Sequence, residues 1–411
     1  MAERDLLTFF LQIAVMLLAA FLLGESMRKL GQPAVLGEII GGIILGPSIL
    51  GLVAPGIHSF IFLQSEQAHI MVSSFVSLGM LFFLFIAGME IDLSQIRRTG
   101  RVSLLMSLFG ILVPFALGAA SVVLFPDVWR APGGNGTLFA VFVGAALSIS
   151  ALPVIIRILM DLRLTQTKLG QIIITSAIID DLVGWSLFIY VLGMMTSTEA
   201  ANPVFSLFRI ILLGVVVILL GRFLGTRFVA FSRRISAQAE SLLAMISVVI
   251  IGVAIAASLC GVHPVFGAFL VGVALGPALK HTPCAEVVIR QFAISFFAPL
   301  YFVSIGMRLD FTRYFDLPLV LLVAVVAFAG KLLGIGTGAY IGGLKTRDVA
   351  TVAFGLNARG AVEIILAGVA LAAGVVDDRI FLALVVMALL TTTVSVPVIR
   401  HFTRSSPAGE G

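Results

Sequence analysis

Apolar stretches of about 20 residues recur along this chain from residue 5 to residue 403. A stretch of that length, wound as an α-helix, crosses the roughly 30 Å hydrocarbon core of a bilayer and satisfies its own backbone polar groups. The sequence therefore predicts an all-α polytopic membrane protein. The composition agrees, because 60% of the residues are hydrophobic, 11% are charged and the mean hydropathy is +1.16, whereas ordinary soluble domains are about 25% charged.

We predict about thirteen transmembrane helices, which form a single transmembrane domain over residues 1–411. Their ranges are 5–27, 33–53, 69–91, 102–125, 136–160, 169–195, 204–221, 240–260, 263–279, 287–307, 317–341, 348–374 and 379–399. We expect the first range to be a retained span, because it lacks the small-residue cleavage site of a signal peptide.

The lysines and arginines divide unequally between the two sets of connections that join these spans. One set holds 18 of the 26 basic residues: Arg28, Lys29, Arg97, Arg98, Arg101, Arg157, Arg163, Lys168, Arg222, Arg227, Arg233, Arg234, Lys280, Arg290, Lys345, Arg347, Arg400 and Arg404. Because cytoplasmic loops carry the excess of basic residues, this pattern places the C-terminus in the cytoplasm and the N-terminus outside. The basic residues thus have a topological use, and we expect no nucleic-acid partner.

Five charged residues fall near the middle of predicted spans: Asp180, Asp181, Lys331, Arg359 and Glu363. A charge that faces lipid at this depth costs several kcal/mol, so such groups are normally paired or exposed to a water-filled cavity. Asp180 and Asp181 are adjacent on a helix and point about 100° apart. We predict that one aspartate pairs with Lys331 while the other faces a hydrated cavity and binds the transported species. A purely structural ion pair would leave the second carboxylate without a role.

A carboxylate in such a cavity can hold either a proton or a small cation, because hard cations favour oxygen ligands. Competition between the two for one carboxylate is sufficient for exchange, provided that only the occupied site crosses the membrane. The predicted partners are therefore monovalent cations, protons and the lipid bilayer. We expect no cofactor, and Cys260 and Cys284 lack the spacing of a metal site.

The segments "GAALSISALPVIIRIL" and "FGLNARGAVEIIL" each place helix-breaking residues in the middle of a span. Ser148, Ser150 and Pro153 interrupt the first, and Asn357 and Gly360 lie in the second. Proline removes a backbone donor, and nearby serines can replace lost partners. Paired interrupted helices in corresponding positions indicate a transporter site. We therefore predict inverted repeats, formed by spans four to six and eleven to thirteen, with two broken crossing helices.

Several segments together identify a family resemblance that covers nearly the whole chain. They are "LGQPAVLGEIIGGIILGPSILG", "LFFLFIAGMEIDL", "ALSISALPVIIRIL", "AIIDDLVGW", "HPVFGAFLVGVALGP", "FFAPLYFVSIGM" and "GLNARGAVEIILAGVAL". In this order they resemble the membrane domain of monovalent cation:proton antiporter family 2. The resemblance implies the sodium/proton antiporter fold, a homodimer, and a core that moves against a dimerisation part. It assigns residues 1–95 and 235–310 to the dimerisation scaffold, 100–195 and 315–403 to the mobile core, and 200–235 to a linking helix.

The resemblance also implies residue roles. Asp181 matches the carrier of the metal cation and the proton, and Asp180 matches the carboxylate that pairs with Lys331. The broken helices contribute Ser148, Ser150, Asn357, Arg359 and Glu363. Relatives with two aspartates and this lysine are usually electrogenic Na⁺/H⁺ exchangers. The sequences of the two broken segments, however, are closer to those of the K⁺-associated and plant-like branches of the family. Many relatives carry an additional cytoplasmic domain, and we expect no regulation of that kind here.

We therefore predict a secondary antiporter, and not an enzyme, in the inner (plasma) membrane that exports Na⁺, or alternatively K⁺, in exchange for protons. One alternative is a passive cation channel, but the sequence shows no filter motif. Another is an intramembrane aspartyl protease, which needs two carboxylates close enough to share a proton. Adjacent aspartates on one helix diverge, so this reading ranks last.

Overall fold

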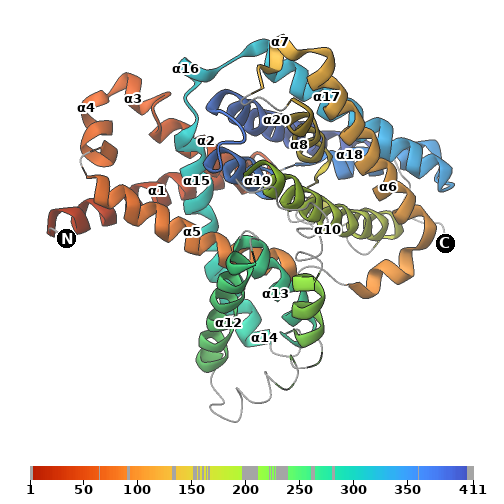
Figure 1. Ribbon diagram of the computed structural model, residues 1–411, viewed down its shortest axis with the longest axis horizontal. Coiled ribbons are helices and arrows are strands. Elements are labelled where there is room, and N and C mark those ends of the chain that lie inside the picture. Colours follow the sequence, from red (N-terminus) through yellow and green to blue (C-terminus); the bar gives the residue numbers. More distant parts are fainter. Residues whose placement is uncertain are drawn as a thin grey trace. The chain divides into compact units, whose positions relative to one another are not determined.

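In the computed structural model, every regular element in the described part of the chain is a helix, and no strand occurs there (Figure 1). The structure describes residues 3–63, 65–89, 93–131, 136–150, 167–196, 212–221, 239–260, 264–279, 283–359 and 361–404, with single residues 155, 158, 159, 162, 164, 223, 225 and 227. The all-α architecture predicted from the apolar runs is confirmed.

Eight helices in the described part of the chain are long and apolar enough to cross a membrane. They cover Glu3–Lys29, Ala34–Val53, Glu66–Met89, Arg101–Leu124, Ser241–Leu259, Glu286–Arg308, Leu317–Ile341 and Asp378–Phe402. Shorter apolar helices cover Gly136–Ser148, Leu212–Gly221 and Pro264–Leu279. Several predicted spans include residues outside the described ranges, so the total of thirteen stays a prediction.

The chain divides into two compact units. Unit 1 comprises Met1–Asp92 and Ala201–Asp310, and unit 2 comprises Leu93–Ala200 and Phe311–Gly411. Each unit therefore combines segments that lie far apart in the sequence. The assignment of scaffold and mobile roles to particular ranges, and of a linking helix to residues 200–235, stays a prediction.

Unit 1 contains both long apolar helices and short helical segments. Its elements are α1 (Glu3–Lys29), α2 (Ala34–Leu45), α3 (Leu50–Val53), α4 (Pro55–His58), the π-helix η1 (Ser59–Leu63), α5 (Glu66–Met89), α12 (Ala239–Leu259), α13 (Pro264–Leu279), α14 (Pro283–Phe292), the π-helix η2 (Ala293–Phe297) and α15 (Ala298–Arg308).

Glycines allow helices of unit 1 to cross at close range. A Cβ at Gly88 of α5 would lie 2.2 Å from the Phe269 carbonyl oxygen, and one at Gly272 of α13 would lie 2.1 Å from that of Phe85, so both sites exclude side chains.

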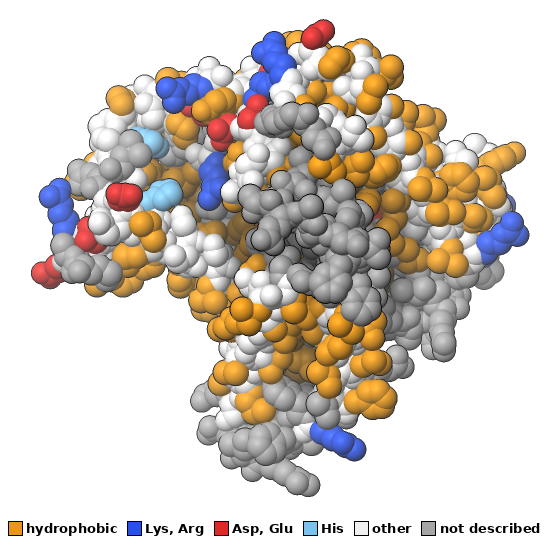
Figure 2. Space-filling view, in the orientation of Figure 1, with side chains coloured by type: hydrophobic (Ala, Val, Ile, Leu, Met, Phe, Trp, Pro, Cys, Tyr) orange, Lys and Arg blue, Asp and Glu red, His pale blue; other side chains and the backbone are white. Residues whose placement is uncertain are grey.

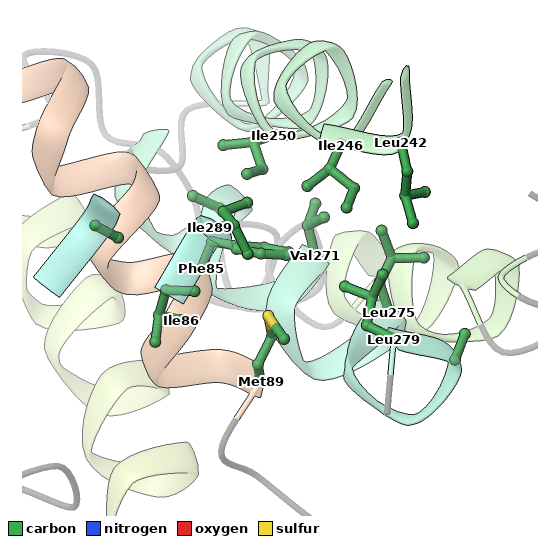
Figure 3. Packing of buried hydrophobic residues seen from close by; sticks show 13 residues of the cluster. Phe85, Ile86, Met89, Leu242, Ile246, Ile250, Val271, Leu275, Leu279 and Ile289 are labelled. Carbon is green, nitrogen blue, oxygen red and sulfur yellow. The ribbon is translucent and has the colours of Figure 1, made fainter. Parts of the chain in front are cut away.

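The core of unit 1 is apolar where α5, α12, α13 and α14 meet (Figure 3). Phe85, Ile86 and Met89 project from α5 toward side chains of the other three helices. These partners include Leu242, Ile246, Ile250, Val271, Leu275, Leu279 and Ile289. The contacts are between hydrocarbon groups, so this cluster supplies packing and carries no charge.

Unit 2 contains α6 (Leu93–Leu124), α7 (Pro126–Trp129), α8 (Gly136–Ser148), α10 (Lys168–Thr196), α16 (Phe311–Tyr314), α17 (Leu317–Ile341), α18 (Thr346–Asn357), α19 (Ala361–Ala372) and α20 (Asp378–Arg404). Helix α17 begins at a side-chain cap, because the Asp316 carboxylate accepts a hydrogen bond from the Leu319 N–H at 3.1 Å. It ends before Gly343, whose φ of +88° is a left-handed value that glycine adopts without strain.

Helix α17 packs closely against α6 through glycines spaced four residues apart. A Cβ at Gly330 would lie 2.7 Å from Pro114 Cα, and one at Gly334 would lie 2.3 Å from the Phe109 carbonyl oxygen. Small residues at this spacing let the backbones of membrane helices approach each other. Lys331 follows Gly330 directly, so the glycine contact fixes the depth and rotation of the helix that carries this lysine.

Large hydrophobic side chains are exposed on both units, and Figure 2 shows them over much of the visible face, with charged side chains in a few separate groups. Helix α1 exposes Leu7, Phe10 and Phe21 at 57% or more of their surface, and α12 exposes Val248 and Leu259 at 71% and 84%. Such faces are stable in hydrocarbon and costly in water. The fold therefore presents the lipid-facing surface that the sequence predicted.

Candidate functional site

A buried ion pair joins α10 and α17 in unit 2. Lys331 Nζ lies 2.9 Å from Asp180 Oδ2, and both side chains have 0% of their surface exposed. Neither charge is stable alone in such a place, because the desolvation of an unpaired ion costs several kcal/mol. The structure thus brings together the two residues that the sequence predicted as charge partners.

Ser150 connects this ion pair to the first helix break. Helix α8 ends at Ser148, Ile149 and Ser150 are not helical, and residues 155, 158 and 159 are helical again. The buried Ser150 hydroxyl lies 2.9 Å from Asp180 Oδ2 and 3.2 Å from the carbonyl oxygen of Leu356. A hydroxyl has one proton to donate, so these two acceptors compete for it.

Arg359 occupies the second helix break, between the end of α18 at Asn357 and the start of α19 at Ala361. Its buried guanidinium donates to the Leu147 carbonyl oxygen at 2.5 Å. Leu147 lies in the last turn of α8, where carbonyl groups have no partner within the helix. The two breaks therefore exchange contacts: Ser150 reaches the last turn of α18, and Arg359 reaches the last turn of α8.

A second buried ion pair lies within the second break. Arg359 Nη1 donates to Glu363 Oε1 at 2.8 Å, and the side chains are 0% and 3% exposed. The residues are four positions apart, across a gap in the helix. Because the pair is desolvated, Glu363 keeps the guanidinium compensated while Arg359 binds the end of α8.

Unused polar atoms remain beside these contacts. Asp180 Oδ1, Glu363 Oε2, Arg359 Nε and both amide atoms of Asn357 are buried without a hydrogen-bond partner among the described residues. Buried polar groups normally have partners, and exceptions are typical of functional sites or of positions that hold water or an ion. The carboxylate and amide oxygens here are of the type that binds hard cations.

The other predicted site residues are placed only in part. Asp181 lies on α10, one position after Asp180, but its side chain is outside the described residues, and so is Pro153. The Ser148 hydroxyl donates to the Ala145 carbonyl oxygen of its own helix at 2.8 Å. The cation-binding roles of Asp181, Asp180, Ser148 and Ser150 stay predictions, and so do those assigned to Asn357, Arg359 and Glu363.

Sequence reasoning missed Thr392 of α20, whose buried hydroxyl contacts the backbone of Arg359. It also missed the serines that tie α6 to α10, where Ser107 donates to the Ser176 carbonyl oxygen at 2.9 Å. Serine and threonine are ordinary packing residues in membrane helices. The run "TTTVS" is the only local signal for Thr392, and it does not indicate which hydroxyl leaves its own helix.

Comparison with known families matches residues 13–404 to the family described as "Sodium/hydrogen exchanger, transmembrane". Cation/H(+) antiporter 18 of Arabidopsis thaliana is 34% identical over an alignment of 404 residues, and the match covers 95% of this chain and 48% of that protein. The chain thus spans about half the length of this relative. The Na(+)/H(+) antiporter NhaS4 of Synechocystis sp. is 30% identical, with 97% of this chain and 98% of that protein covered.

The fold is similar to that of a solved structure. The sodium proton antiporter MjNhaP1 from Methanocaldococcus jannaschii, at pH 8, superposes with a TM-score of 0.69. The match covers 97% of each chain at 16% sequence identity. At this identity the likeness concerns the fold alone.

Proposed function

The chain belongs to the sodium/hydrogen exchanger family, and from this premise we propose that it is a secondary antiporter that exchanges a monovalent cation for protons. Na⁺ is the preferred cation of this proposal, because a relative covered over nearly its whole length is named a Na(+)/H(+) antiporter. K⁺ stays the second candidate, since another relative, from Bacillus cereus, is named a Na(+)/H(+)-K(+) antiporter.

The observation that carries the proposal is the buried Asp180–Lys331 pair beside two helix breaks, with a second carboxylate next in sequence. The pair is electrically neutral, and so is the Arg359–Glu363 pair. Of the five charged residues near the middle of predicted spans, Asp181 is then the one whose negative charge these two pairs do not compensate. A single Na⁺ or a single proton neutralises it, and a neutral core crosses a low-dielectric region at lower cost than a charged one.

In this mechanism Asp181 is the carrier, while Asp180 and Lys331 set the charge around it. A cation and a proton exclude each other at Asp181. After the site releases one of them on one side of the membrane, it therefore binds the other before it returns. Exchange of more than one proton per cation requires that another group, such as Lys331, also releases a proton during the cycle. The ratio of protons to cations therefore reports whether the Asp180–Lys331 pair opens.

Ser150 is the group that we expect to respond to such opening. While Asp180 is ionised, the hydroxyl proton is drawn to the carboxylate at 2.9 Å rather than to the Leu356 carbonyl at 3.2 Å. A protonated Asp180 would donate to Ser150 instead, and the hydroxyl proton would then turn to Leu356. Protonation at α10 is in this way coupled to the contact between the two broken helices.

The two alternative functions, a passive channel and an aspartyl protease, require properties that differ from those of an antiporter. A passive channel moves ions only down their gradient, whereas an antiporter uses one gradient to drive the other ion uphill. An aspartyl protease needs a pair of carboxylates that share a proton, but Asp180 is engaged by a lysine at 2.9 Å. The family match and this pair both favour transport.

The proposal includes an orientation and an assembly. We propose residence in the plasma membrane, with the N-terminus outside and the C-terminus in the cytoplasm, from the distribution of basic residues. We also propose a homodimer in which unit 2, which holds both buried ion pairs, moves while unit 1 serves as the scaffold. The transported cation and the proton are substrates, and the proposal includes no cofactor.

The deciding experiment uses purified protein in proteoliposomes with a pH-sensitive dye inside. An imposed pH gradient should drive Na⁺ against its own gradient in wild-type protein, and Asp181→Asn should abolish this exchange while the folded protein is retained. Asp348→Asn is the control, since it removes a carboxylate from the first turn of α18. Titration with Na⁺, K⁺ and Li⁺ ranks the cations. Exchange that persists in Asp181→Asn would refute the carrier role.

A further inference from the structure

The gap between α18 and α19 leaves backbone groups without helical partners. Ala358 has extended backbone angles, with φ of −64° and ψ of 125°, so the helical hydrogen-bond pattern stops there. Arg359, the next residue, is fully buried. A buried backbone N–H or C=O without a partner costs about 1 to 3 kcal/mol in a protein interior. The peptide groups of Arg359 therefore need partners from another element.

Thr392 of α20 supplies both partners with one hydroxyl. The Arg359 N–H donates to Thr392 Oγ1 at 3.1 Å, and Thr392 Oγ1 donates to the Arg359 carbonyl oxygen. A hydroxyl can accept and donate at once, so this pair of bonds uses its capacity without conflict. The Thr392 side chain is 2% exposed, so water does not replace it.

The two neighbouring threonines act differently. The Thr391 hydroxyl donates to the Ala388 carbonyl oxygen at 3.0 Å, and the Thr393 hydroxyl donates to the Leu389 carbonyl oxygen at 2.7 Å. Bonds of this kind, to the preceding turn of the same helix, are the usual ones for threonine in a helix. Among these three residues, Thr392 alone reaches across to the helix break.

Residues next to the contact between Thr392 and Arg359 reach the first helix break, after α8. Arg359 donates through its guanidinium to the Leu147 carbonyl oxygen at the end of α8, and Leu356 accepts from Ser150 at 3.2 Å. Ser150 in turn lies 2.9 Å from Asp180. A shift of the Arg359 backbone would therefore move both contacts that the two breaks exchange, and with them the surroundings of Asp180.

We propose that Thr392 is a positioning residue for cation exchange. It clamps the peptide groups of Arg359 and so holds the second helix break in the position at which Arg359 and Leu356 engage the first. This inference rests on the proposed function, and it adds to it a residue on α20 whose hydroxyl bonds to the backbone of the break.

The test compares variants of two adjacent threonines in proteoliposomes. Thr392→Val keeps the shape of the side chain and removes the hydroxyl, Thr392→Ser keeps the hydroxyl, and Thr391→Val removes a bond within α20. Loss of groups that orient a metal-binding site typically weakens affinity about 10- to 100-fold. We expect Thr392→Val to raise the apparent KM for Na⁺ by about tenfold, with Thr392→Ser and Thr391→Val close to wild type.

A purely structural role predicts another pattern. Thr391→Val and Thr392→Val would then lower the thermal stability alike, without a selective change in KM, and this result would overturn the inference. Thr392→Ser with the KM of Thr392→Val would overturn it as well. If Thr392→Val does not fold, Thr392→Cys replaces it, because its thiol is a weak donor and acceptor; an apparent KM unchanged from wild type would then count against the clamp.

The experiment also separates this inference from the proposed function. Wild-type protein without coupled exchange would overturn both. Wild-type exchange that Asp181→Asn abolishes, together with an unchanged KM in Thr392→Val, would overturn the role of Thr392 alone.

Discussion

Ser150 and Thr392 contribute hydroxyl groups to the two helix breaks of unit 2, and the two hydroxyls are used differently. Ser150 has two acceptors, Asp180 and the Leu356 carbonyl, for one proton. Thr392 has one donor and one acceptor, both on Arg359. The Thr392 hydroxyl is matched by its two partners, whereas the single proton of the Ser150 hydroxyl has two acceptors, at 2.9 Å and 3.2 Å.

This difference indicates that one break has a fixed hydrogen-bond arrangement and the other a changeable one. A hydroxyl with matched partners holds one geometry, because any rotation loses a hydrogen bond. A hydroxyl with competing acceptors can change partner when the charge on one acceptor changes. On the proposed mechanism, the first break lies where a protonation change at Asp180 would alter a helix contact, and the second break would keep a single geometry during that change.

The largest expected effect comes from removing the lysine that neutralises Asp180. Lys331→Ala leaves a buried carboxylate without its cation, and loss of one partner of a buried ion pair typically costs about 3 to 5 kcal/mol. We expect a clear fall in the thermal unfolding temperature of the purified protein and a loss of exchange. Lys345→Ala, at an exposed position before α18, should change neither.

A double variant sharpens this result. Asp180→Asn combined with Lys331→Ala removes both charges and should recover part of the stability that Lys331→Ala loses. A thermal unfolding curve of Lys331→Ala that matches wild type would mean that the pair contributes nothing to the fold. It would also remove the reason for Ser150 to favour Asp180 over Leu356.

An intermediate effect is expected at the first break itself. Ser150→Ala removes the donor shared by Asp180 and Leu356, and a buried acceptor without its donor costs about 1 to 3 kcal/mol. The rate of Na⁺-driven proton movement should fall, with moderate loss of stability. Ser395→Ala is the matched control, because Ser395 is also buried and its hydroxyl donates within its own helix α20, to Thr391. Equal effects of the two substitutions would contradict the special position of Ser150.

The smallest effect is expected away from both breaks, where Asp316 caps α17 and lies 2.9 Å from Arg379 of α20. Burial acts to raise the pKa of Asp316, but the Leu319 N–H and Arg379 together lower it below its ordinary value of 3.8. Asp316→Asn keeps a residue that can cap the helix but removes the charge that pairs with Arg379, so it should lower the free energy of unfolding by at most about 1 kcal/mol at neutral pH. It should leave the KM for Na⁺ unchanged.

The pH dependence of this effect follows from the direction of the pKa shift. A carboxylate with a lowered pKa stabilises the fold above its ordinary pKa, and this contribution is lost as the pH falls through the folded value. The unfolding temperatures of wild type and Asp316→Asn should therefore converge below about pH 4. Asp127→Asn, at an exposed position of α7, provides the control; a constant difference between wild type and Asp316→Asn at all pH values would contradict the assignment.

Much of the fold could be predicted because the bilayer restricts what an apolar sequence can form. Runs of about 20 apolar residues must become helices in hydrocarbon, so the ranges predicted for the spans and the helices observed in the described residues correspond closely, as at 317–341 and Leu317–Ile341. The break after Asn357 was also readable, since glycine and polar residues interrupt an apolar run there.

The sequence alone determined that charges lie inside membrane spans, and the cost of an unpaired charge in that medium required them to have partners. Only the tertiary structure decided the particular contacts: Ser150 rather than Ser148 beside Asp180, Arg359 at the end of α8, and Thr392 rather than Thr391 or Thr393 at the break. The physical reason is that hydrophobicity and charge are properties of residues in order. A hydrogen bond depends on the rotation and depth of two helices, which close packing sets, as glycines such as Gly330 do where α17 meets α6.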